Sequence, residues 1–221
     1  MQIKYLIFSI VLLFTSCNKP QAENFKNGDI IFQDSTSSQS KAIKLATHSD
    51  YSHMGIIYKK EGKSYVYEAS ATVRLTPLQK WIERGVGKRF VVKRLKNETL
   101  LTPKALIMMR KVGKNFSDHP YDALFNWSDK KIYCSELVWK IYKRALGIEL
   151  GKLQKLKSFD LSHPSVKAKL QERYGVNIPL EEFAIAPQGI FDSNLLVTVY
   201  KISLKTTLLK SFLSLQLKLY E

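Results

Sequence analysis

The stretch Ile132–Gly147, IYCSELVWKIYKRALG, has the apolar periodicity of a helix with one buried face. Its apolar residues recur at intervals of three and four positions: Leu137, Val138, Ile141, Tyr142, Ala145 and Leu146. Gly147 is a favourable C-terminal stop, and the last turns hold cations that suit the helix dipole: Lys140, Lys143 and Arg144. The pattern predicts a helix whose first turn contains Cys134.

Cys134 is the candidate reactive residue of this helix. At a helix N-terminus, the exposed backbone N–H groups and the positive end of the dipole favour a thiolate over a thiol. The chain has only two cysteines, so if Cys17 is modified, Cys134 has no disulfide partner. An unpaired thiol in an exported protein is more typical of a reactive role than of packing. The alternative is a small buried hydrophobe that opens a helix.

The N-terminus has the features of an export signal. Lys4 precedes an apolar run at 5–14, which is too short for a permanent membrane span and typical of a signal-peptide core. The run ends in Leu13-Phe14-Thr15-Ser16-Cys17, which resembles a bacterial lipobox. We predict a lipoprotein signal peptide at 1–16, lipidation of Cys17, a tether at 17–26 and a single domain at 27–221. The alternative is a plain secretory signal that includes Cys17.

These features predict a protein of the cell envelope, anchored by lipid to a bacterial membrane on its periplasmic or outer-membrane face. The formal net charge of +16 would favour nucleic acid in a cytosolic protein. The export signal and the lack of a binding motif argue against a nucleic-acid partner. An anionic envelope surface is the better partner, and a merely solvated basic exterior is the alternative.

The chain, 45% apolar and 11% aromatic over 221 residues, has the composition of an ordinary globular domain. Strand-like runs are expected at 30–33, 54–58, 64–69, 89–95 and, buried, at 195–202. Helical patterns occur within 35–47, 73–84, 103–113, 165–174 and 206–220, and Thr102 is the expected cap of the third of these. The last pattern predicts an amphipathic helix that docks on the core or lies on a membrane.

The two runs around Lys59–Lys63 should form a hairpin whose register is testable. If the turn is centred between Glu61 and Gly62, then Gly55 lies opposite Glu68. His53 and Glu68 are then diagonal neighbours on one face, within reach of a carboxylate–imidazole hydrogen bond. Gly55 has no side chain and leaves space for that carboxylate.

Several motifs carry a family resemblance. In order, they are GDIIF at 28–32, YSHMGI at 51–56, YEA at 67–69, PYD at 120–122, YCSEL at 133–137 and APQGIFDS at 186–193. This ordered set resembles the YiiX-like group, the circularly permuted branch of NlpC-type papain-like amidases and peptidases. The resemblance covers about Phe25 to Ile202.

The resemblance implies an α+β, papain-like fold with a small antiparallel sheet or partial barrel packed against helices. It implies that Cys134 is the nucleophile, His53 the base and Glu68 the residue that orients His53. Tyr121, and with it Tyr133, would lie near the substrate. No cofactor and no metal is implied, and a Cys–His–Glu zinc site is the alternative.

These residues predict a monomeric thiol hydrolase that cleaves amide bonds through a thioester. Its expected substrates are cell-wall peptides or small amino-acid amides. One alternative keeps the nucleophile and makes the substrate a lipid, as in an acyltransferase or lipase. Another is a non-catalytic envelope lipoprotein that binds its ligand on the same fold.

Overall fold

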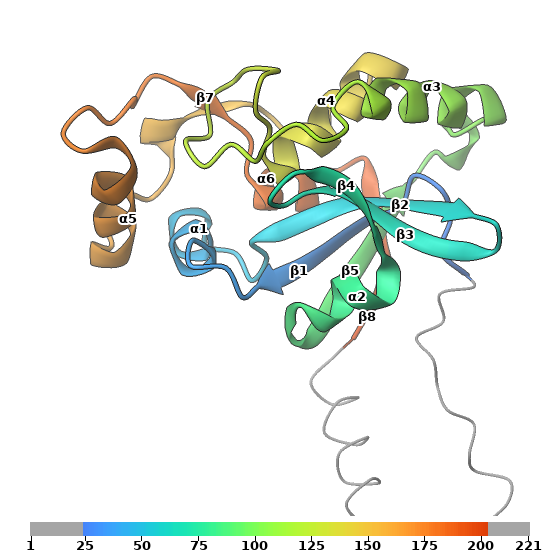
Figure 1. Ribbon diagram of the computed structural model, residues 1–221, viewed down its shortest axis with the longest axis horizontal. Helices are drawn as coiled ribbons and strands as arrows, with labels where there is room; N and C mark the ends of the chain where they lie inside the picture. The colour runs from blue at the N-terminus through green and yellow to red at the C-terminus, as the bar shows by residue number, and fades with distance from the viewer. Residues whose placement is uncertain (1–23, 203–221) are drawn as a thin grey trace, which may run out of the picture.

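A six-stranded antiparallel sheet forms the centre of the protein, whose computed structural model describes residues 24–202 (Figure 1). The strand order is β4-β3-β2-β1-β5-β8. The strands are β1 (Ile30–Ser35), β2 (His53–Lys60), β3 (Lys63–Ala69), β4 (Val73–Pro77), β5 (Gly85–Leu95) and β8 (Leu196–Lys201). The sheet is open, with β4 and β8 at its edges, so it matches the predicted small sheet and not the partial barrel.

Helices cover both faces of this sheet (Figure 1). They are α1 (Ser40–Thr47), α2 (Leu78–Glu83), α3 (Pro103–Lys114), α4 (Cys134–Leu146), α5 (Pro164–Tyr174) and α6 (Pro187–Phe191). Short elements complete the chain: η3 (Glu98–Leu100), η4 (Leu156–Ser158) and the pair β6 (Gln154–Lys155) and β7 (Phe183–Ala184). Helices α3 and α4 lie over one face, α2 covers the other, and α5 packs beside α1.

The central strands are apolar on both sides because both faces are covered. In β1, Ile30 and Phe32 belong to the apolar cluster under α4, whereas Ile31 belongs to the cluster around Trp81 on the other face. Phe25 falls within the predicted tether at 17–26, yet it is buried and packs against the rings of Phe90 and Tyr200. The folded domain therefore begins before residue 27.

Local sequence signals placed most helices correctly. The side chain of Thr102 accepts a hydrogen bond from the backbone N–H of Ala105 at 3.2 Å, as expected of the cap of α3. Helix α4 begins at Cys134, and Gly147 ends it in the left-handed conformation with a φ of 70°. Both predictions are confirmed.

The helical pattern around Leu78, Trp81 and Ile82 is confirmed as α2, whereas the preceding residues 73–77 form strand β4, which was not predicted, and pair with β3. Two other expectations were wrong. Strand β8 is mostly exposed because it is an edge strand with one neighbour. Lys140 does not serve the helix dipole: it is 2% exposed and its Nζ lies 2.6 Å from Glu136 Oε1 and 2.8 Å from Asp129 Oδ1.

The predicted signal peptide, the lipidation site Cys17 and the helix expected at 206–220 lie outside the described residues. Within residues 24–202, no helix is both long enough and apolar enough to cross a membrane.

The close approach of β2 and β3 at Gly55 predicts a destabilising substitution. A Cβ atom at Gly55 would lie 2.5 Å from Val66 Cγ1 and 2.6 Å from the Tyr67 carbonyl oxygen. We expect Gly55→Ala to lower the free energy of unfolding by about 1–3 kcal/mol, as overpacking does. Urea unfolding measures it. Gly189→Ala in helix α6 is the control, because its nearest neighbour is the side-chain atom Ile185 Cδ1 at 3.2 Å. Equal effects of the two substitutions would contradict the prediction.

Candidate active site

The β2–β3 hairpin has the predicted register. Ile56 pairs with Tyr67 and Lys60 with Lys63, so the same register places Gly55 opposite Glu68. On the shared face, His53 Nε2 lies 2.6 Å from Glu68 Oε2. Gly55 makes room chiefly for Val66 and the Tyr67 carbonyl, whereas Glu68 Cβ would be 3.4 Å from an added Cβ. The predicted hydrogen bond is confirmed, and the predicted reason for the glycine is only a minor part of the explanation.

Glu68 is fully buried and all its partners are hydrogen-bond donors. Thr76 Oγ1 donates to Glu68 Oε1 at 2.5 Å, and the Arg84 guanidinium donates to the same oxygen. Burial raises the pKa of Glu68, but the bonds to His53 and Thr76 and the charge of Arg84 outweigh it and lower the pKa to about 2. The carboxylate therefore stays ionised in the interior of the protein and fixes the orientation of the imidazole.

His53 lies between Glu68 and Cys134. Burial lowers the pKa of His53, but the side-chain hydrogen bonds and charges of Cys134 and Glu68 outweigh burial and raise the pKa to about 9. Since Nε2 is engaged by Glu68, Nδ1 is the nitrogen left for the thiol. The ring also stacks on Trp81, with centroids 5.8 Å apart. These contacts favour an imidazolium at neutral pH.

Cys134 is the first residue of α4 and is 3% exposed. Its backbone N–H belongs to the first helical turn, where N–H groups lack an intrahelical acceptor. The preceding Tyr133 is buried, and its hydroxyl accepts a hydrogen bond from the Ile185 backbone N–H at 3.1 Å. The ring of Tyr133 lines the cavity described below, but its hydroxyl is already engaged.

Tyr121 lies near Cys134 and lines a pocket together with His53. It is held by a bridge to Ile132 just before α4 and by its backbone N–H, which donates to the Ala71 carbonyl. Burial raises the pKa of Tyr121, and the negative charge of Cys134 adds to this effect. Gln39 Nε2 donates to the Tyr121 hydroxyl at 2.7 Å.

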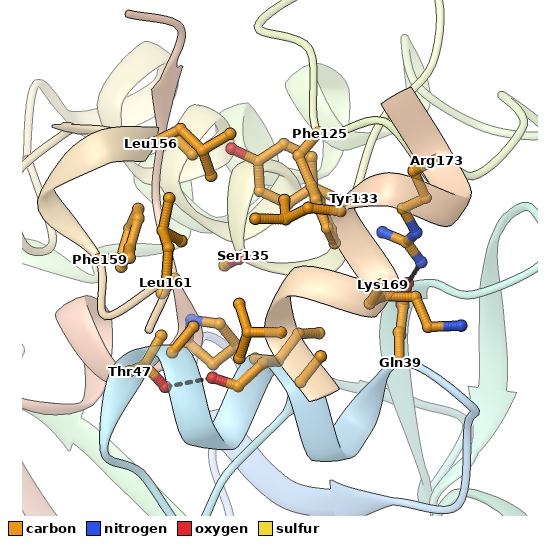
Figure 2. Close-up of a pocket in the computed structure, with 18 of the residues that line it drawn as sticks. Gln39, Thr47, Phe125, Tyr133, Ser135, Leu156, Phe159, Leu161, Lys169 and Arg173 are labelled. Carbon is orange, nitrogen blue, oxygen red and sulfur yellow. Dashed lines mark hydrogen bonds between the residues drawn. The ribbon is translucent and has the colours of Figure 1, made fainter. Parts of the chain in front are cut away.

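An apolar cavity of about 110 Å³ opens beside Cys134 (Figure 2). One wall is the face of α1 that carries Ala42, Ile43 and Ala46, where small side chains leave space. The segment between α4 and α6 forms the opposite walls, including Leu156, Phe159, Leu161, Val166 and Leu170. Lys169 and Arg173 line the end nearest Gln39 (Figure 2).

A second, polar pocket of about 350 Å³ lies on the His53 side. His53, Tyr121 and Arg84 line it together with Ser70. Gln39 lines both the polar pocket and the apolar cavity. Cys134 thus lines the apolar cavity, and His53 lines the polar pocket.

Several supporting residues were missed by the sequence reasoning. Thr76 was not identified because strand β4 was not predicted. The alternation of Val73-Arg74-Leu75-Thr76 could have indicated that strand. Arg84 was placed in a helix with no assigned contact. Gln39 and Arg173 are 134 positions apart, and no local pattern links them.

A thiol at a helix N-terminus, facing a histidine and a carboxylate on an antiparallel sheet, is the arrangement of papain-like hydrolases. The family described as permuted papain-like amidase enzymes, YaeF/YiiX, C92 family, matches residues 24–200. The chain belongs to this family and has its permuted papain-like fold.

Two relatives from Escherichia coli are similar over most of the domain. The uncharacterized protein YiiX of strain K12 is 52% identical over 176 residues, which cover 80% of this chain and 86% of that protein. The crystal structure of metalloprotein YiiX from strain O157:H7 is 51% identical and has a TM-score of 0.77. It covers 80% of this chain and 97% of that chain.

Because the O157:H7 relative is described as a metalloprotein, the donor atoms of this site bear on whether the chain could hold a metal. Within residues 24–202, no group of three or more His, Cys, Asp or Glu side chains could hold a metal ion. At the site itself, the oxygens of Glu68 accept from His53, Thr76 and Arg84. These side chains do not fit a metal centre.

The shifted pKa values predict the pH range in which the His53–Glu68 pair stabilises the fold. The pKa of Glu68 is lowered from 4.5 to about 2, so its contribution is present above pH 4.5 and is lost as the pH falls towards 2. The pKa of His53 is raised from 6.5 to about 9, so its contribution is complete below pH 6.5 and is lost as the pH rises through 9.

The measurement is the difference in unfolding free energy between the wild type and His53→Gln across this pH range. We expect a plateau between about pH 4.5 and 6.5 and a fall on both sides. A difference that stays constant above the plateau would contradict the raised pKa of His53.

Proposed function

We propose that this protein is a cysteine amidase in which Cys134, His53 and Glu68 form the catalytic triad. The observation that carries the proposal is the position of His53, which is bonded to Glu68 through Nε2 and interacts with Cys134. Membership of a papain-like amidase family supports the reaction class.

In the first half of the reaction, the Cys134 thiolate attacks the carbonyl carbon of the substrate. The carbonyl oxygen becomes an oxyanion as the S–C bond forms. The His53 imidazolium gives its proton to the leaving nitrogen, the C–N bond breaks and a thioester remains. The pKa of about 9 means that His53 carries this proton at neutral pH.

In the second half, the now neutral His53 removes a proton from water, which attacks the thioester. The acid is released, and Cys134 and His53 return to the thiolate and imidazolium forms. The backbone N–H of Cys134 is one donor to the oxyanion. The Tyr121 hydroxyl, which lies beside the site, is the second donor in this proposal.

The apolar cavity beside Cys134 supports a substrate that presents an acyl-like apolar group. A polar wall peptide would bury its charges and amides against Ile43, Leu161 and Phe159, and unpaired polar groups are costly there. An alkyl chain in the same place would gain roughly 0.8 kcal/mol for each buried methylene. The cavity therefore favours the lipid alternative over cell-wall peptides, and the amide or ester of a fatty acyl chain is the proposed substrate.

The test is hydrolysis of acyl p-nitroanilides and p-nitrophenyl esters with short, medium and long chains, beside a wall-type stem peptide. We expect kcat/KM to rise with chain length, about tenfold for two buried methylenes. Cys134→Ser should abolish turnover, and His53→Ala should lower it by about 10²–10⁴-fold. If the wild type hydrolyses none of these substrates, the amidase proposal is overturned and the alternative of a non-catalytic binding lipoprotein is favoured.

A cavity-filling variant separates the substrate class from the chemistry. Ala46→Phe on α1 should remove the preference for long chains while short substrates are still cleaved. Ala168→Phe is the matched control, because Ala168 is exposed on α5 and does not line the cavity. A stem peptide cleaved better than any acyl substrate would restore the wall-peptide substrate.

We further propose that Cys17 is acylated and anchors the protein in the cell envelope. The support is the lipobox-like sequence Leu13-Phe14-Thr15-Ser16-Cys17. In bacterial cells fed labelled palmitate, the wild type and Cys134→Ser should carry label and Cys17→Ser should not. Label retained in Cys17→Ser would contradict the anchor.

A further inference from the structure

Three side chains from distant parts of the sequence form a hydrogen-bonded chain that ends at the active site. Arg173 on α5 donates from Nη2 to Gln39 Oε1, and Gln39 Nε2 donates to the Tyr121 hydroxyl at 2.7 Å. Figure 2 shows Arg173 and Gln39 joined at one end of the cavity. Each link crosses between separate segments, so the chain exists only in the folded protein.

The direction of each hydrogen bond is fixed by the first donor. A guanidinium has only donors, so it must face the oxygen of the Gln39 amide and not its nitrogen. The NH₂ group of Gln39 is thereby turned towards Tyr121. Because that group can only donate, the Tyr121 oxygen must accept.

A tyrosine hydroxyl that accepts from Gln39 still has its own proton to donate. Within residues 24–202, no side chain or carbonyl is hydrogen-bonded to that proton. The hydroxyl lies close enough to Cys134 for the thiolate charge to raise the pKa of Tyr121. The proton is available to the carbonyl oxygen of a substrate bound at Cys134.

The far end of the chain is held firmly. The guanidinium of Arg173 lies 4.9 Å from the centroid of the Phe125 ring, and such a contact restrains its planar fork. Phe125 packs edge-on against Tyr133, with centroids 5.1 Å apart, immediately before Cys134. The helix that covers the apolar cavity is thus linked to the residue beside the nucleophile.

We propose that Gln39 and Arg173 are positioning residues that set the direction of the Tyr121 hydroxyl, so that it donates to the oxyanion rather than to the protein. This inference rests on the proposed amidase function and assigns two residues that its triad does not include. It also gives α5 a part in catalysis as well as in lining the cavity.

The decisive variant is Gln39→Glu, which keeps the shape of the side chain and reverses one hydrogen bond. A carboxylate still accepts from Arg173, but towards Tyr121 it can only accept, so the hydroxyl proton turns towards Glu at this position. We expect kcat on the best acyl substrate to fall about 10²–10³-fold, the usual loss of one oxyanion donor. The kcat of Tyr121→Phe should fall by a similar factor, and the kcat of the double variant should fall no further.

Two further readouts distinguish this role from a structural or purely electrostatic one. The melting temperature of Gln39→Glu should not decrease, because its ion pair with Arg173 replaces a neutral bond. Alkylation of Cys134 by iodoacetamide forms no oxyanion, so its rate should be unchanged in Gln39→Glu and Tyr121→Phe. Gln171→Glu, an exposed charge change on α5, is the matched control and should keep wild-type kcat.

The outcomes separate the two proposals. A wild type no more active than Cys134→Ser overturns the amidase itself. An active wild type whose kcat is retained in Gln39→Glu overturns only the positioning role. A fall in alkylation equal to the fall in kcat would also overturn it, because the new charge would then be acting on the thiolate.

Discussion

The buried carboxylate of Glu68 is the constraint on which the site depends. It has no exposed surface, so its charge must be balanced inside the protein by His53, Thr76 and Arg84. Removing one partner of a buried ion pair typically costs about 3–5 kcal/mol, because the remaining charge is left uncompensated. The register of three strands and the start of β5 are therefore coupled to one side chain. That side chain in turn determines which nitrogen of His53 faces Cys134.

The proposed catalytic groups and the proposed substrate cavity come from different parts of the chain. Helix α4 and the sheet hold the thiol, imidazole and carboxylate. The segment between α4 and α6 contains η4 and α5, and these two elements line the apolar cavity together with α1. Because the cavity and Cys134 depend on different packing contacts, the cavity can change without moving Cys134. Gln39 is the place where they meet, since it lines both pockets.

The loop between Tyr121 and Ile132 is also held by buried polar groups. Asp122 accepts hydrogen bonds from the backbone N–H groups of Leu124 and Asn126 at 2.8 and 2.9 Å. Lys140 then ties the end of the loop to α4 through Asp129 and the Ser128 carbonyl. The loop carries Tyr121 at one end and leads into Cys134 at the other, and the bridge between Tyr121 and Ile132 holds its two ends together.

The sequence alone determined the elements whose signals are local. The helix at Cys134, its glycine stop, the Thr102 cap and the β2–β3 register follow from periodicity and turn chemistry over a few residues. The contact between His53 and Glu68 followed from that register. The ordered motifs also indicated the family to which the chain belongs.

Only the tertiary structure decided the rest, because it depends on contacts between segments far apart in the chain. Strand β4 exists because β3 is there to pair with it, and the exposure of β8 follows from its place at the sheet edge. Lys140 is buried because Glu136 and Asp129 offer opposite charges inside the protein. The apolar cavity and the Arg173–Gln39–Tyr121 chain have no sequence signature, since hydrogen-bond direction and enclosed space arise only when α1, α5 and α4 meet.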